Sequence, residues 1–183
     1  NTIENFSRRD FWRSVIICCE GFSILCERHA REAQAQMSGA GPKRRADLER
    51  IARVCAHLAH NPPETLHQAL QMVYFVFVGL FIEGNAGGYS PGLLDQYLLP
   101  FYEKDRQRGL CDEEALEIIE CLWVKMGEQI WYWNEPAARH YSGFCAFQNI
   151  ALGGLDTHGR DAVNTLTYLM LQASIDVRMV QPS

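Results

Sequence analysis

The sequence predicts an α/β protein that is mostly helical, and three observations lead to this prediction. Apolar residues recur at helical spacing through most of residues 1–140. A short β-compatible stretch that ends in two glycines, residues 144–154, precedes a turn and a further helical pattern. The 183-residue chain is 48% hydrophobic, which is enough to bury a substantial core. We therefore expect a mainly helical part, residues 1–140, and a strand–loop–helix part, residues 141–183.

The first two helices are expected over residues 2–37 and 43–60. In the first helix, the apolar positions that share one face are Phe11, Val15, Cys18, Phe22, Leu25 and His29. "SGAGP" ends this pattern. "NPP" ends the second helix, because proline supplies no amide hydrogen and disfavours a helical residue before it.

The third helix is expected over residues 64–82, with Pro63 suited to its first turn. Its second half is apolar almost all round, so it should be surrounded by protein. The longest apolar run, residues 69–82, contains Gln71 and is short for a bilayer span. We therefore predict a central core helix and no association with a membrane.

Two helices should follow a glycine-rich turn, "EGNAGGYSPG". The first covers residues 93–108 and is bent or stopped near Pro100, because proline interrupts the helical hydrogen bonds. The second covers residues 112–132 and has Asp112 as its N-cap.

The last quarter of the chain has a different pattern. After the strand, Asp156 and Asp161 are expected to form a turn and cap the next helix, and Asn164 to join the loop to that helix. The terminal "DVRMVQPS" could open a second strand, which would give a βαβ unit and a parallel sheet.

Charge and cysteine usage exclude some classes of protein. A formal charge of -5 without a basic stripe argues against a nucleic-acid partner. The seven cysteines, an odd number without zinc-ligand or Cys-x-x-Cys spacing, indicate reduced thiols in a cytoplasmic protein. We expect buried structural roles for all of them: Cys18, Cys19, Cys26, Cys55, Cys111, Cys121 and Cys145.

One group of residues has the spacing of metal ligands. "ETLH" is the Glu-x-x-His pattern of di-iron helical bundles, and the candidate set is His57, His60, Glu64 and His67. Such a site needs a second Glu-x-x-His and more glutamates, which the sequence lacks, and the prolines at 62–63 turn the first histidine away. We therefore predict helix-surface and capping roles, and no metal site.

Other polar and aromatic features are interpreted as structural. "LGGLDTHGRDA", residues 152–162, resembles a phosphate loop but lacks both the Gly-x-Gly-x-x-Gly and the Walker patterns. The aromatic residues that could flank a ligand, but which we expect to pack helix on sheet, are Trp123, Trp131, Tyr132, Trp133, Tyr141 and Phe144. Glu128, Glu135 and Arg139 could form buried ion pairs.

Several separated motifs resemble one known family. They are "IARVCAHLAHNPPETLHQALQ", "EGNAGGYSPGLLDQYLLPFYEKD", "SGFCAFQNIALGGLDTHGRDAVNTLTYLMLQAS" and the terminal "VQPS". Together they resemble the pyruvate formate-lyase-type domain of glycyl radical enzymes, most of all the branch with glycerol and choline lyases. The resemblance implies a helical outer layer plus the first strand region of a ten-stranded α/β barrel, and residues 1–183 would be part of that domain.

The resemblance also implies a reaction. In the family, a radical S-adenosylmethionine activase installs a glycyl radical, which generates a thiyl radical that abstracts hydrogen from a small substrate. The expected activity is that of a lyase or dehydratase cleaving C–O, C–N or C–C bonds. A decarboxylase or formate acetyltransferase of the same family, or a non-catalytic helical scaffold derived from it, is the alternative.

The family's radical motifs, Gly-Cys-x-Glu and Arg-Val-x-Gly-Tyr, do not occur in these residues. We therefore expect a piece of a longer enzyme that is inactive alone, binds no cofactor itself and has exposed apolar surface where missing strands belong. Its expected partners are the remainder of the chain, the activase, a small-molecule substrate and further copies in a homo-oligomer.

The glycine-rich stretch gives the candidate site. In the lyases that it resembles, a His-Ser pair that binds substrate hydroxyls stands where this chain has Gly87 and Gly88, and an arginine stands at Leu93. The resemblance implies a pocket wall at Gly87, Gly88, Tyr89 and Ser90, without the side chains that recognise glycerol. A site lacking those hydroxyl contacts should discriminate against a polyol.

Overall fold

The structure is a computed structural model that describes residues 3–84, 88–129, 134–141, 147–179 and 181–182. The chain divides into two compact units, residues 1–63 and residues 64–183. The division falls at Pro63, not near residue 140 where the composition changes, because the last strand and helix pack on elements from residues 88–127.

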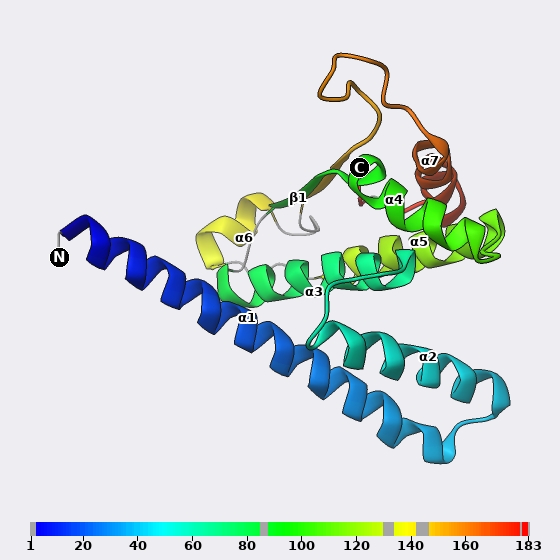
Figure 1. Ribbon diagram of the computed structural model, residues 1–183, viewed down its shortest axis with the longest axis horizontal. Coiled ribbons are helices and arrows are strands. Elements are labelled where there is room, and N and C mark those ends of the chain that lie inside the picture. The colour runs from blue at the N-terminus through cyan, green and yellow to red at the C-terminus, as the bar shows by residue number, and fades with distance from the viewer. Residues whose placement is uncertain (1–2, 85–87, 130–133, 142–146, 180, 183) are drawn as a thin grey trace. The chain divides into compact units, whose positions relative to one another are not determined.

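The first unit is a helical hairpin. α1 (Ile3–Gln36) is followed by a 3-10 turn (Met37–Gly39) and by α2 (Pro42–Leu58), which runs back along α1 (Figure 1). The buried residues of α1 are Cys26, Ala30 and Ala33, whose small side chains allow α2 to pack closely.

The first half of α1 is not covered by α2, which has half its length. Phe11 and Cys18, two of the residues that the periodicity placed on one face of the helix, are therefore exposed in this chain. The helix itself was predicted correctly.

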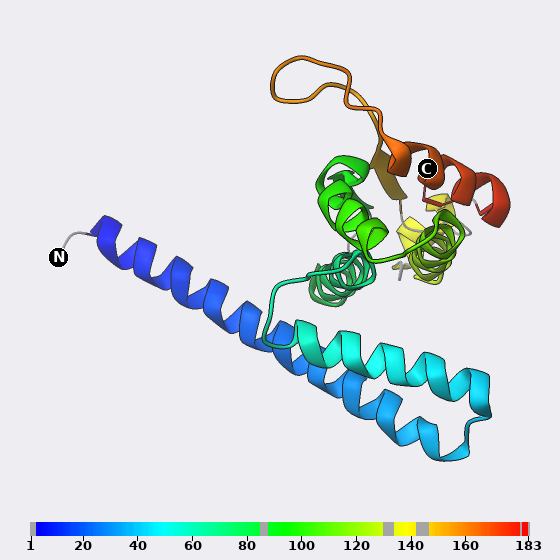
Figure 2. The ribbon, with the colours of Figure 1, turned by 45° about the vertical axis from the view of Figure 1, so that its right-hand side comes forward.

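The second unit contains five helices and two strands among its described residues: α3 (Leu66–Gly84), β1 (Gly88–Leu93), α4 (Leu94–Gln107), α5 (Asp112–Gly127), α6 (Glu135–Tyr141), β2 (Phe147–Ala151) and α7 (Thr165–Val177). α3 packs on α4 and α5, and α7 packs on the same two helices (Figure 2). Their core includes Leu66, Phe77, Leu98, Ile119 and Met170.

β1 and β2 form a parallel two-stranded sheet. Gly88 pairs with Phe147 and Leu93 with Ala151, with an irregularity in register between Tyr89 and Gly92. The prediction of a simple glycine-rich turn before α4 was therefore wrong in part, because residues 88–93 are a strand. Glycine and proline disfavour strands on their own, and here a partner strand supplies the pairing.

α3 is only partly surrounded by residues of this chain. Phe77 and Phe81 are buried, whereas Val76, Leu80 and Ile82 are 40%, 46% and 75% exposed. In the described part of the chain, α3 is the one helix whose length and composition alone would allow it to cross a bilayer, a criterion that core helices of soluble proteins also meet. The prediction that this helix is surrounded by protein is thus confirmed for one face of α3 and not for the other.

Several predicted boundaries need correction. Cys111, rather than Asp112, is the N-cap of α5, and the helix ends at Gly127 instead of residue 132. Asn164, rather than Asp161, caps α7 by accepting a hydrogen bond from the Leu166 amide. α4 continues through Pro100.

The expected strand after α7 does not form in the described residues 178, 179, 181 and 182. Arg178 has a left-handed conformation, with φ of 53°, and ends α7. The Gln181 side chain then accepts a hydrogen bond from the Gln148 amide of β2 at 3.0 Å, so a side chain supplies the contact that a strand would have made.

Candidate functional site

The two faces of the sheet have different surroundings. On one face, Tyr89 packs against the α3 ring of Phe77, with ring centroids 5.0 Å apart, and its register partner Gln148 is buried. The other face carries Gly88, Ser90, Phe147, Asn149 and Ala151, all exposed in this chain. We call this second set the open sheet face.

The structure therefore separates the three candidate pocket residues that it describes, Gly88, Tyr89 and Ser90. Gly88 and Ser90 lie on the open sheet face, whereas Tyr89 lies on the helix-packed face. Burial raises the pKa of Tyr89, so its hydroxyl stays neutral at ordinary pH. Gly87 lies outside the described residues.

Gly88 sits close to the main chain of β2. A Cβ atom at this position would lie 3.3 Å from the carbonyl oxygen of Phe147 and 3.8 Å from its Cβ atom. A side chain here fits only after a shift of a few tenths of an ångström. The Phe147 side chain, on the register partner of Gly88, is 44% exposed.

The carboxyl ends of both strands are joined by a buried hydrogen-bond cluster. Asp95, in the first turn of α4, accepts a hydrogen bond from the Gly153 amide at 2.7 Å, and the adjacent Gln96 donates to the Gly153 carbonyl at 2.6 Å. Asp95 is fully buried, and its Oδ1 atom has no hydrogen-bond partner in the structure. Both polar main-chain groups of one glycine are thus held by successive side chains of α4.

Two residues near the start of α7 complete this cluster. The Thr167 hydroxyl donates to Asp95 Oδ2, and the Asn164 side-chain amide donates to the Asp95 carbonyl at 3.4 Å. The cluster of Asp95, Gln96, Gly153, Asn164 and Thr167, called here the strand-end clamp, joins the β1–α4 junction to the β2–α7 loop. The sequence analysis did not identify Asp95 and Gln96. The signal that could have identified them is an aspartate, immediately after "SPGLL", at a position where a buried residue is expected.

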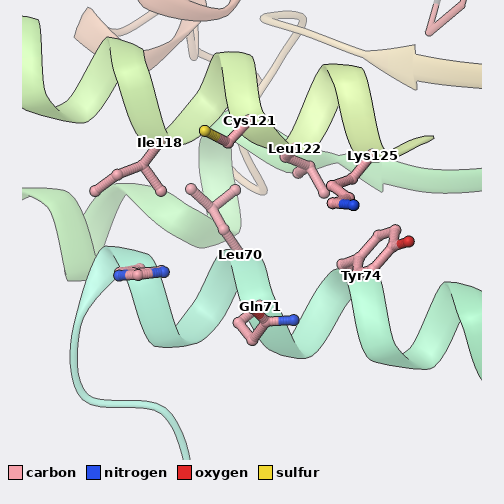
Figure 3. Close-up of a pocket in the computed structure, with 8 residues that line it drawn as sticks. Leu70, Gln71, Tyr74, Ile118, Cys121, Leu122 and Lys125 are labelled. Carbon is pink, nitrogen blue, oxygen red and sulfur yellow. The ribbon is translucent and has the colours of Figure 1, made fainter. Parts of the chain in front are cut away.

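A small pocket lies between α3 and α5 (Figure 3). It has a volume of about 80 Å³ and is lined by His67, Leu70, Gln71, Tyr74, Ile118, Cys121, Leu122 and Lys125. The Tyr74 hydroxyl accepts a hydrogen bond from Gln129 at 3.2 Å, and burial raises its pKa. Lys125 pairs with Glu128 at 2.8 Å. Among the polar lining residues, Tyr74 and Lys125 are thus engaged in structural contacts.

The residues considered as metal ligands have structural contacts. Nε2 of His57 lies 2.8 Å from the Pro62 carbonyl, His60 lies 3.2 Å from Glu27, and the Glu64 amide donates to Gln68 at 2.7 Å. The described residues contain no group of three or more potential ligands that could hold a metal ion.

The cysteines differ from the expectation of uniform burial. Cys26 and Cys55 are buried, and burial raises the pKa of Cys26 to about 12 and that of Cys55 to about 11. Cys18, Cys19 and Cys121 are exposed in this chain, so the prediction was wrong for them. Cys111 is part-exposed at the α5 N-cap, and Cys145 lies outside the described residues.

The loop after β2 closes on itself. The Asp156 carboxylate accepts hydrogen bonds from the amides of His158, at 2.8 Å, and Arg160, at 3.0 Å, and also pairs with the Arg160 guanidinium. These hydrogen bonds lower the pKa of Asp156. Because the carboxylate occupies amides that a phosphate would need, the turn interpretation fits and the phosphate interpretation does not.

The remaining candidates have structural places. Trp123 is buried and donates from Nε1 to the Ser174 hydroxyl at 2.8 Å, which packs α5 on α7. Tyr141 is exposed, and the other aromatic candidates lie outside the described residues. Glu135 and Arg139 form an ion pair at the surface, not a buried one.

Comparisons with known proteins agree with this arrangement over the whole chain. The family model for pyruvate formate lyase-like proteins matches residues 1–183. Isethionate sulfite-lyase from Nitratidesulfovibrio vulgaris is 34% identical over 98% of this chain and 22% of its own length. Trans-4-hydroxy-L-proline dehydratase from Clostridioides difficile is 34% identical over 100% of this chain and 24% of its own length.

A solved structure shares the fold. The glycerol-bound form of the B12-independent glycerol dehydratase from Clostridium butyricum superimposes with a TM-score of 0.91 at 30% identity, over 100% of this chain and 23% of that protein. The fold and the parallel strand pair therefore define a part of a glycyl radical enzyme domain. The chain belongs to the pyruvate formate lyase-like family and spans about a quarter of the length of the relatives it matches.

Proposed function

We propose that this chain is part of a glycyl radical lyase or dehydratase that cleaves a C–O, C–N or C–C bond of a small substrate, or the C–S bond that a sulfite-lyase breaks. The observation that supports the proposal is the match over all 183 residues to enzymes named as a sulfite-lyase and a dehydratase. In this proposal, a thiyl radical on a residue outside this segment abstracts hydrogen from the substrate, and a radical S-adenosylmethionine activase generates the glycyl radical from which it derives.

The contribution of this segment is one wall of the pocket. The open sheet face is the part of the described chain that combines strand geometry, exposure and polar side chains such as Ser90 and Asn149. In the complete enzyme, further strands would enclose this face and exclude water from the radical. No cofactor needs to bind to the segment itself for this role.

The substrate class follows from Gly88. A relative with a bound glycerol has this fold, and the resemblance gives such enzymes a hydroxyl-binding pair at the positions of Gly87 and Gly88. With Gly88 and the exposed Phe147 ring at this point of the wall, the pocket favours a substrate that is bulkier or less hydroxylated than glycerol.

The proposed setting is the cytoplasm of an anaerobic cell, where thiols stay reduced and the radical is protected from oxygen. The partners are the remainder of the enzyme chain, the activase and further copies in a homo-oligomer.

The test uses the full-length protein encoded by the complete reading frame, activated anaerobically. We expect a glycyl radical doublet in the electron paramagnetic resonance spectrum and turnover of isethionate or trans-4-hydroxy-L-proline in preference to glycerol. Release of carbon dioxide or formation of an acyl-thioester would instead identify a decarboxylase or an acetyltransferase. Absence of any radical after activation would refute the radical proposal and favour a scaffold.

A further inference from the structure

The strand-end clamp occupies a special place in the register of the sheet. Leu93 and Ala151 form the last register pair of β1 and β2. Asp95 and Gly153 each lie two residues beyond that pair, and they are joined by the 2.7 Å hydrogen bond. The clamp therefore continues the strand register beyond the last main-chain pair. At this point the Asp95 side chain accepts the hydrogen bond that the main chain of β1 would otherwise accept.

The ladder by itself specifies this register weakly. Its two pairs at Gly88 and Tyr89 are separated by the irregularity from the two pairs at Gly92 and Leu93. Short, glycine-rich and bulged strands are those in which pairing slips most easily. A slip by one residue would turn Gly88 and Ser90 to the helix-packed face, so the register decides which residues form the pocket wall.

β2 is fixed independently of the clamp. The Gln148 side chain donates to the Met126 carbonyl of α5 at 2.8 Å, and the Gln148 amide donates to Gln181 at 3.0 Å. β1 has fewer anchors: Tyr89 contacts α3, and the chain then passes directly into α4. The clamp thus adds a side-chain contact to the pairs at Gly92 and Leu93 that join the carboxyl end of β1 to the fixed strand.

A buried carboxylate such as that of Asp95 costs free energy that a residue needed only to fill the core would avoid. The carboxylate is fully buried, receives hydrogen bonds from one amide and one hydroxyl, and forms no ion pair recorded in the described part of the chain. Burying a carboxylate without a cation is unfavourable, and the unpartnered Oδ1 atom adds to that cost. An apolar residue would fill the same space but could not hold Gly153.

We propose that Asp95 is a positioning residue for the substrate pocket: with Thr167 and Gln96 it holds Gly153 and thereby sets the stagger of β1 against β2, which places Gly88 beside Phe147. This inference rests on the proposed function only in taking the open sheet face as the pocket wall. Asp95 itself is fully buried and is not part of the open sheet face.

The test compares variants in the full-length, anaerobically activated enzyme. Thr167→Val removes the hydroxyl that donates to Asp95 at nearly constant volume, and Thr167→Ser keeps the hydroxyl. Asp95→Ala removes the clamp. The matched control is Glu103→Gln, which neutralises an exposed carboxylate of the same helix.

The readout is kcat/KM per glycyl radical, with the radical counted by electron paramagnetic resonance, for isethionate and trans-4-hydroxy-L-proline. Misplacement of a pocket wall by about 1 Å costs up to about 100-fold, so we expect a loss of about 10- to 100-fold for Asp95→Ala and a smaller loss for Thr167→Val. Thr167→Ser and the control should match the parent enzyme. A merely structural role would lower the radical yield and leave turnover per radical unchanged.

Hydrogen exchange gives a second readout that does not need a substrate. In Thr167→Val, amides of residues 88–93 should exchange faster, while those of α3 stay unchanged. Unchanged exchange in β1 and unchanged turnover per radical in Thr167→Val would overturn the positioning role, even if Asp95→Ala failed to fold. If the parent enzyme formed no radical, the proposed function would fail, whereas the exchange data would still decide the role of the clamp.

Discussion

Gly153 and Gly154 offer a quantitative test of the loop conformation next to the strand-end clamp. The φ of Gly153 is 66°, in the left-handed region, and a Cβ atom there would lie 2.9 Å from Cγ2 of Val163. The neighbouring Gly154 has a φ of 81° with open space around the position of a Cβ atom. Alanine at either position keeps the main-chain groups, so Gly154→Ala measures backbone strain alone and Gly153→Ala measures strain together with a steric clash.

The two contributions can be estimated separately. A left-handed conformation costs a residue with a side chain about 1–2 kcal/mol. Overpacking against a neighbour adds about 1–3 kcal/mol. Gly153→Ala should therefore destabilise the loop by about 2–5 kcal/mol and Gly154→Ala by about 1–2 kcal/mol. In the double variant Gly153→Ala with Val163→Ala, the cost should fall back toward that of strain alone, because the clashing methyl group is gone.

Hydrogen exchange of residues 152–164 in the full-length enzyme measures the free energy of local opening. A cost of 1–2 kcal/mol corresponds to about 5- to 30-fold faster exchange, so Gly154→Ala should fall in this range and Gly153→Ala above it. Equal exchange in Gly153→Ala and Gly154→Ala would show that Val163 does not limit the space. No change in Gly154→Ala would refute the assigned backbone conformation.

Three further outcomes are expected in the same enzyme. Ser174→Ala leaves the buried indole N–H of Trp123 without its acceptor. It should lower the free energy of unfolding in urea by about 1–3 kcal/mol, whereas an unfolding midpoint equal to that of the wild type would contradict the hydrogen bond. Burial, with an added hydrogen bond to a carboxylate, raises the pKa of Tyr102 to about 12. Because the folded state then favours the neutral hydroxyl, the free energy of unfolding should fall as pH rises from 10 to 12, and Tyr102→Phe should flatten that decline. Cys26 and Cys55, with pKa values raised by burial, should resist iodoacetamide at pH 8 until the protein is unfolded, as read by mass spectrometry; rapid native labelling would contradict their burial.

Local signals in the sequence identified most helices correctly. Periodicity and proline placed α1, α2 and α3 within a few residues of their observed ends, and a helix was expected where α7 lies. These features depend on contacts between residues three or four positions apart, which a single sequence displays directly. β2 was also recognised, because its apolar stretch ends in a glycine pair that turns the chain.

The family was recognisable for a different reason. The motifs around "GLLDQY" and "FQNIALGG" form the parts that the structure joins at the strand ends, Asp95 and Gln96 on one side and Gly153 on the other. The sequence carried the residues of the clamp, but not the information that they meet.

By itself, then, the sequence determined most of the helices, one strand and the family of this protein, because those depend on local spacing and on motif order; α6 was not among the helices it predicted. Only the tertiary structure decided that residues 88–93 are a strand, because their pairing partner lies more than fifty residues away and their glycines and proline disfavour a strand locally. It also decided that Gly88 and Ser90 share one face while Tyr89 faces α3. That distinction depends on register, which long-range hydrogen bonds set and local composition does not.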